Sequence, residues 1–110
     1  VLKVAPLSDT GHYKSDKKSV YIINGDGLYK VGASQDPEER LENLQSTSPV
    51  GLELVYKSPR VDDAFLIEGD IHDEFSEYHS HGEWFEFPNE ILGQVVQRIQ
   101  FRTVDSEEDQ

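Results

Sequence analysis

Three side chains of different chemistry stand out in this sequence of 110 residues: the phenol of Tyr21, the guanidinium of Arg40 and the carboxylate of Glu68. Together such groups can transfer protons, bind anions and hold cations. Glu68 is the least ordinary, because it falls within an apolar helical stripe, where a carboxylate without a partner is costly to bury. A cationic partner is hard to find nearby, since positions 61–97 contain no Lys or Arg. The sequence therefore favours a functional role for Glu68.

Two of these residues have ordinary structural explanations when they are taken alone. Tyr21 could be a half-buried strand aromatic, and Arg40 could lie on a helix surface and pair with Asp36. His72 lies one turn beyond Glu68 on the same helical face, so it could join Glu68 at a metal or donate to a backbone carbonyl. We favour a supporting or packing role for His72.

Strands are predicted on both sides of a glycine turn. Runs of β-branched and aromatic residues at 20–23 and 28–33 flank Asn24-Gly25-Asp26-Gly27, whose Asn and Gly residues tolerate the positive φ of hairpin turns. Alternating apolar residues predict a third strand at 52–57, and residues 82–87 suit a short extended segment.

Three helices are expected, and two of them carry residues named above. Asp36-Pro37-Glu38-Glu39 supplies an N-cap, a proline at the first helical position and an acid at N3, so a helix with Arg40 should run to about Ser46. Asn89 can cap the last helix. The middle helix can begin at Asp62 or Asp63, and one face of it would hold Ala64, Ile67, Glu68, Ile71, His72 and Phe75.

The order β-β-α-β-α-β-α predicts an α+β fold with a small central antiparallel sheet flanked by helices, because hairpin-linked strands pair first and helices cover the apolar faces. A chain of 110 residues holds one domain, which we place at 19–102. Residues 1–18 should form an arm and residues 103–110 a disordered acidic tail.

The net charge of −12 is unusual for a protein that binds nucleic acid. The acids are unevenly spread: residues 61–97 hold ten acids and no base, and residues 105–110 add four more. The rest of the chain has a net charge of +2. A polyanion should therefore approach the hairpin side with help from a divalent cation, whereas the acidic face would suit a protein partner.

Composition limits the cellular locations that are expected for this chain. No apolar run approaches the roughly 20 residues that a membrane helix needs, so no membrane contact is expected. The chain has no Cys and no signal-peptide pattern, and we expect an intracellular location, either cytoplasmic or nuclear. The chain contains no Met, so its native start is expected to be missing. Residues 79–81, His-Ser-His, are expected to form a loop, and their spacing matches no standard zinc site.

Taken in order, the short motifs resemble the GIY-YIG endonuclease superfamily, in particular its phage Orf-type and meiotically up-regulated members. The resemblance covers residues 19 to about 90. It is carried by Val20-Tyr21-Ile22-Ile23, Lys30-Val31-Gly32, Asp36-Pro37-Glu38-Glu39-Arg40-Leu41, Ile67-Glu68 with His72, and Gly82-Glu83-Trp84-Phe85. It implies a metal-dependent endonuclease that hydrolyses phosphodiester bonds, with DNA favoured over RNA.

The resemblance also implies a role for each residue. Tyr21 would act as general base or position the attacking water, Arg40 would hold a phosphate oxygen, and Glu68 would bind Mg²⁺ or Mn²⁺. Lys30 stands where a second tyrosine is usual; we include it as catalytic, since Lys30 and Arg40 could lower the pKa of Tyr21 from about 10. The alternative is a catalytically inactive, GIY-YIG-like module that binds a protein or nucleic acid.

Overall fold

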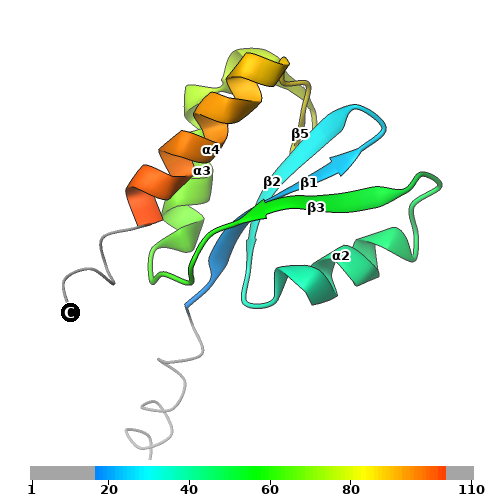
Figure 1. Ribbon diagram of the computed structural model, residues 1–110, viewed down its shortest axis with the longest axis horizontal. Coiled ribbons are helices and arrows are strands. Elements are labelled where there is room, and N and C mark those ends of the chain that lie inside the picture. The colour runs from blue at the N-terminus through cyan, green and yellow to red at the C-terminus, as the bar shows by residue number, and fades with distance from the viewer. Residues whose placement is uncertain (1–16, 104–110) are drawn as a thin grey trace, which may run out of the picture.

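The computed structural model describes residues 17–103, which form an antiparallel sheet with helices on both faces (Figure 1). The expected α+β class is confirmed. The expected arm and acidic tail lie almost wholly outside the described residues. The elements follow in the order β1 Ser19–Gly25, β2 Leu28–Ser34, α2 Pro37–Gln45, β3 Leu52–Lys57, α3 Ala64–Glu74, a 3₁₀ turn at Ser76–Tyr78, β4 His79–His81, β5 Trp84–Phe85 and α4 Asn89–Thr103.

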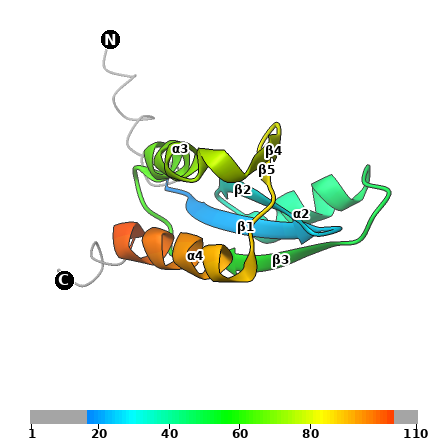
Figure 2. The ribbon, with the colours of Figure 1, turned by 90° about the horizontal axis from the view of Figure 1, so that it is seen from above.

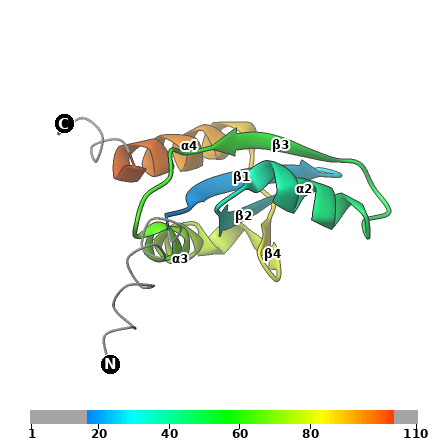
Figure 3. The same ribbon diagram turned by 90° about the horizontal axis from the view of Figure 1, so that it is seen from below.

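The β1–β2 hairpin forms the centre of the sheet, whose strand order is β3-β1-β2-β5-β4. Asp26 and Gly27 have positive φ values of 53° and 84° and connect the two strands in a two-residue turn, as the glycine-rich segment predicts. The edges of the sheet are β3 and β4, which lie on opposite sides in Figure 3. Tyr21 is therefore on a central strand, with a paired neighbour on each side.

The two faces of the sheet are covered by different helices. Val20 and Ile22 of β1 belong to the main core, which includes Ile67 of α3 and Val95 of α4. Because successive side chains of a strand point to opposite faces, Tyr21 points to the other side, which α2 covers. Figures 1 and 2 show α3 and α4 together on one face of the sheet and α2 on the other.

The start signal of α2 and the apolar stripe of α3 are found where the sequence predicts them. The Asp36 side chain accepts a hydrogen bond from the Glu39 backbone N–H at 3.1 Å, and Pro37 is the first residue of α2. Along α3, Ala64, Ile67, Ile71 and Phe75 are buried, whereas Glu68 and His72 are half-buried at the margin of the stripe.

Within residues 17–103, no helix is both long and apolar enough to cross a membrane.

Two local predictions are corrected. Residues 79–81 form strand β4 and not a loop, because they pair with β5 around Gly82, whose φ is +58°. No residue of β4 is buried, so no apolar alternation marked this strand. Asn89 is the first residue of α4 and not its cap, since the Pro88 carbonyl already accepts the Leu92 N–H at 2.9 Å. The sheet thus has one strand more than expected.

Candidate functional site

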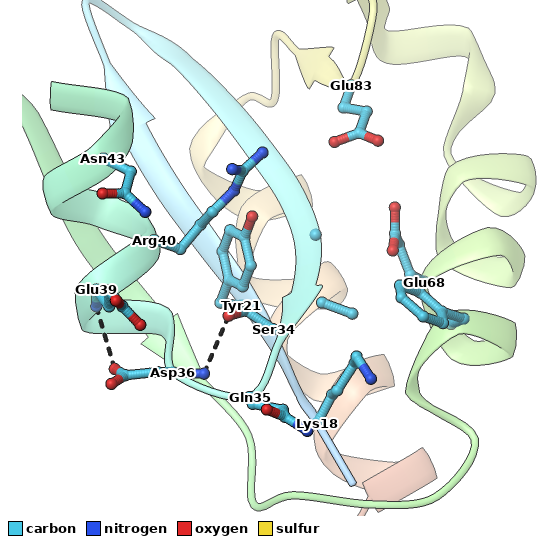
Figure 4. Close-up of a pocket in the computed structure, with 13 residues that line it drawn as sticks. Lys18, Tyr21, Ser34, Gln35, Asp36, Glu39, Arg40, Asn43, Glu68 and Glu83 are labelled. Atoms are coloured by element: carbon cyan, nitrogen blue, oxygen red, sulfur yellow. Dashed lines mark hydrogen bonds between the residues drawn. The ribbon is translucent and has the colours of Figure 1, made fainter. Parts of the chain in front are cut away.

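An open pocket of about 500 Å³ lies where the central hairpin, α2, α3 and the β4–β5 turn meet (Figure 4). Tyr21 of β1, Arg40 of α2 and Glu68 of α3 all line it, and Glu83 lines it from the turn. Three of the four residues predicted to be catalytic, Tyr21, Arg40 and Glu68, therefore line one pocket, and the fourth, Lys30, does not. Their chemical roles remain predictions.

Tyr21 reaches the pocket by lying across the neighbouring strand. Its partner in the strand register is Gly32, and a Cβ atom at position 32 would lie 2.5 Å from the Tyr21 hydroxyl oxygen and 2.7 Å from Cζ. The Tyr21 residue is 2% exposed. Glycine at position 32 is thus what allows the phenol to cross β2.

The pKa of Tyr21 is raised above its usual 10.0, chiefly because the phenol is buried. The Arg40 guanidinium beside it lowers the pKa, while the Glu83 and Glu68 carboxylates raise it further. Help from Lys30 was expected and is not found among these effects. At neutral pH the hydroxyl is therefore protonated and available to donate a hydrogen bond.

Arg40 extends from α2 toward the Tyr21 hydroxyl (Figure 4). The alternative, in which Arg40 pairs with Asp36, is not what the structure shows, because the Asp36 carboxylate caps the helix instead. The guanidinium is thus directed at the pocket, where an anion can reach its planar fork.

Glu68 enters the pocket beside the outer edge of β2. Strand β5 has two residues, which pair with Tyr29 and Lys30, so there is room next to the following part of β2 for side chains of α3. Burial raises the pKa of Glu68, and so does the Glu83 carboxylate, whereas His72 and Lys30 lower it. A neutralising cation would therefore be favourable at this carboxylate.

His72 supports this edge of the sheet. Its Nε2 lies 2.9 Å from the Val31 carbonyl oxygen, and because a carbonyl only accepts, Nε2 must donate. The ring packs edge-on against Phe85, with 4.9 Å between centroids, and Nε2 is 3.6 Å from the Glu68 carboxylate. A nitrogen that donates to a carbonyl has no lone pair for a metal, so the geometry fits the supporting role.

Lys30 does not line this pocket. Its side chain is 8% exposed, its Nζ lies 2.5 Å from Glu83 Oε1, and the ring centroid of Trp84 is 6.0 Å away. The ion pair lowers the pKa of Glu83, with the hydrogen bond from Lys30 as the main cause. The structure thus places Lys30 behind Glu83, and its charge also lowers the pKa of Glu68 across the pocket.

A family model, that of the T5orf172 domain, matches residues 18–100 and so covers every element that lines the pocket. The chain belongs to the T5orf172 family. This corrects the sequence-based assignment to the GIY-YIG superfamily, which is a different family. The half-motifs behind that assignment are strand segments of three or four residues, too short to separate families of similar hairpins. Neither a curated protein nor a solved structure matches the chain significantly.

The T5orf172 family is associated with nucleic-acid binding and with nuclease-like domains. In this T5orf172 domain the carboxylates of Glu68 and Glu83 point toward one another across the pocket (Figure 4). Residues 17–103 contain no group of three or more His, Cys, Asp or Glu side chains that could hold a metal. Two carboxylates with space for water suit a hard cation such as Mg²⁺, which keeps much of its hydration shell.

Glu83 and Phe65 line the pocket of this T5orf172 domain but are not among the residues predicted as a site. Glu83 belongs to the predicted extended segment and to the motif Gly82-Glu83-Trp84-Phe85, and its pairing with Lys30 shows that it is held at the site. Phe65 also lines the pocket, and the Nζ of Lys18 lies 5.1 Å from its ring centroid. Phe65 precedes Glu68 by one turn but does not belong to the apolar stripe of α3. A large aromatic residue outside that stripe is the signal by which the sequence could have indicated Phe65.

Proposed function

We propose that this T5orf172 domain is a metal-dependent endonuclease that hydrolyses phosphodiester bonds of nucleic acid, with DNA as the first substrate to test. One observation carries the proposal: Tyr21, Arg40 and Glu68 line a single pocket although they come from three different elements. A domain kept only as a scaffold gains nothing from a half-buried carboxylate with a raised pKa.

Arg40 would bind the phosphate at the bond to be cut. Its planar fork can donate two hydrogen bonds to the non-bridging oxygens, and its charge stabilises the negative charge that grows on them in the transition state. The Tyr21 hydroxyl next to it would hold the attacking water by a hydrogen bond, since its raised pKa makes it a poor base at neutral pH.

Glu68, together with Glu83, would hold Mg²⁺ or Mn²⁺, which when bound would supply Lewis-acid polarisation of a phosphate oxygen. Lys30 would keep the Glu83 carboxylate in place through their ion pair. In the reaction the water oxygen bonds to phosphorus and its proton passes to solvent, while the bond to the leaving oxygen breaks and that oxygen takes up a proton from solvent. The chain's own part is to orient the phosphate and the water.

The decisive experiment is an incubation with single- and double-stranded DNA and RNA, with and without Mn²⁺ or Mg²⁺. The wild-type protein should yield products only with metal, and Arg40→Gln should yield none. Arg98→Gln is the matched control, because Arg98 pairs with Glu74 on the surface and does not line the pocket. Absence of cleavage under every condition would overturn the proposal.

The second candidate function is an inactive binding module, and the net charge of −12 favours it. In that case the incubation would give no products, while nucleic acid or a protein would still bind. Arg40→Gln would then weaken only the binding of nucleic acid. The same set of variants therefore separates the two functions.

A further inference from the structure

Phe65 is an exposed aromatic side chain at the rim of the pocket. It lies in the first turn of α3 and is 63% exposed, and Leu66 beside it is 60% exposed. The buried positions of this helix are taken by Ala64, Ile67 and Ile71, so Phe65 is not needed for the core. Two adjacent exposed apolar side chains at the rim of a polar pocket indicate a binding surface.

One cation lies beside this ring, and a second cation lines the pocket next to it together with four carboxylates. Lys18 Nζ lies 5.1 Å from the Phe65 ring centroid, and Lys18, Arg40 and Phe65 line the same pocket. An aromatic face next to cations that can meet phosphate is the arrangement that binds single-stranded nucleic acid, because every base has a face that can stack. A purely apolar partner would form no favourable electrostatic contact with these cations.

Because the domain is acidic, a stacking contact can contribute affinity for nucleic acid that phosphate contacts do not supply. Among the eight Lys and Arg residues within 17–103, at least four form ion pairs with carboxylates of the same range: Lys30, Lys57, Arg98 and Arg102. Few cations are therefore positioned for phosphates, and an acidic protein gains little affinity from the backbone of a nucleic acid. Stacking on an aromatic ring does not depend on net charge.

We propose that Phe65 stacks on an unpaired nucleobase next to the phosphate bound in the pocket, so that the preferred substrate is single-stranded or carries an unpaired nucleotide at the cleaved bond. The inference rests on the proposed function for the position of that phosphate. Bases inside a duplex stack on each other, so their faces are closed to Phe65 unless the nucleotide is unpaired.

The test uses a single-stranded oligonucleotide with 2-aminopurine, whose fluorescence is quenched on stacking, and the full chain without divalent metal and again with Ca²⁺. Wild-type protein and Phe65→Tyr should quench it, and Phe65→Ala should not. The affinity of Phe65→Ala for the oligonucleotide should fall about tenfold or more. Phe101→Ala is the control: Phe101 is 73% exposed on α4, does not line this pocket, and should have no effect.

Cleavage measured beside stacking separates this inference from the proposed function. If metal-dependent cleavage occurs and Phe65→Ala cuts single strands as fast as wild type, the stacking site is wrong and the nuclease stands. If quenching depends on Phe65 without any cleavage, the stacking site stands and the nuclease fails. Unchanged binding of nucleic acid in Phe65→Ala, with a change in oligomeric state by sedimentation, would make Phe65 and Leu66 a protein interface and overturn the inference.

Discussion

The ring of Tyr21 lies across Gly32 on the neighbouring strand, so closely that a methyl group at position 32 would come within 2.5 Å of the phenol oxygen. We therefore expect Gly32→Ala to displace the ring, to lower cleavage strongly and to cost about 1–3 kcal/mol of unfolding free energy. Chemical denaturation and a cleavage assay measure the two effects.

Gly93→Ala is the matched control for this substitution. Gly93 lies on α4, and nothing is within 4 Å of the position that its Cβ would take. Alanine there should be neutral or stabilise the helix by up to about 1 kcal/mol. If Gly32→Ala were as harmless as Gly93→Ala, the close approach of Tyr21 to β2 would not limit position 32.

Tyr21→Phe keeps the buried ring and removes only the hydroxyl. Under the proposed function cleavage should fall by about 10²-fold, as for loss of one hydrogen-bond donor aimed at the reacting group. Stability should change by no more than about 1 kcal/mol. Undiminished cleavage in this variant would remove the hydroxyl from the mechanism. Since burial raises the pKa of Tyr21 above 10.0, the cleavage rate should show no Tyr21 titration near neutral pH.

Glu68→Gln should abolish metal-dependent cleavage while making the metal-free protein more stable at neutral pH. Burial raises the pKa of Glu68, so the folded state holds its proton more tightly than the unfolded state does. Stability of the wild type therefore falls as pH rises from about 4.5, the ordinary Glu value, through the raised folded pKa. The advantage of Glu68→Gln should be absent below this window and full above it.

Thermal unfolding of both proteins across this pH range provides the measurement. Glu53→Gln, on the exposed side of β3, is the matched control substitution. A large loss of stability in Glu68→Gln at neutral pH would mean that the carboxylate is a structural partner, for example of His72, which lies 3.6 Å away.

Lys30 and Glu83 should act as one unit in cleavage. Because Lys30 contacts the pocket through Glu83, the double variant Lys30→Met/Glu83→Gln should cleave no more slowly than Glu83→Gln alone. The Glu83 side chain is 49% exposed, so loss of the pair should cost less than about 1 kcal/mol. Multiplicative losses in the double variant would instead show that Lys30 acts directly on the substrate.

Binding of single-stranded DNA should depend only weakly on salt. If Lys18 and Arg40 make about two phosphate contacts, the logarithm of the binding constant should fall with the logarithm of salt at a slope of about −1.4. Arg40→Gln should reduce this slope by about 0.7, and Lys57→Gln, already paired with Glu38, should not change it. A slope several times steeper would mean that another surface binds the nucleic acid.

The elements that depend on neighbouring residues in the chain were determined by the sequence alone. The hairpin turn at Asp26 and Gly27, the Asp36 cap and the stripe of α3 are all where local propensity and periodicity predict them. Strand β4 was not predicted, because it has no apolar pattern of its own. It is a strand because it pairs with β5.

Tertiary structure alone decided which polar groups share the pocket. Glu68 could be selected from the sequence because its carboxylate falls within an apolar stripe, whereas Tyr21 and Arg40 could be selected only from the order of the short motifs that contain them. The sequence predicted Lys30 as catalytic but could not show that it lies outside the pocket, because whether its charge faces the pocket or Glu83 depends on where the β4–β5 turn falls against β2. No local pattern encodes that contact. The pocket is made by long-range packing, whereas the elements that carry its residues are made by local chemistry.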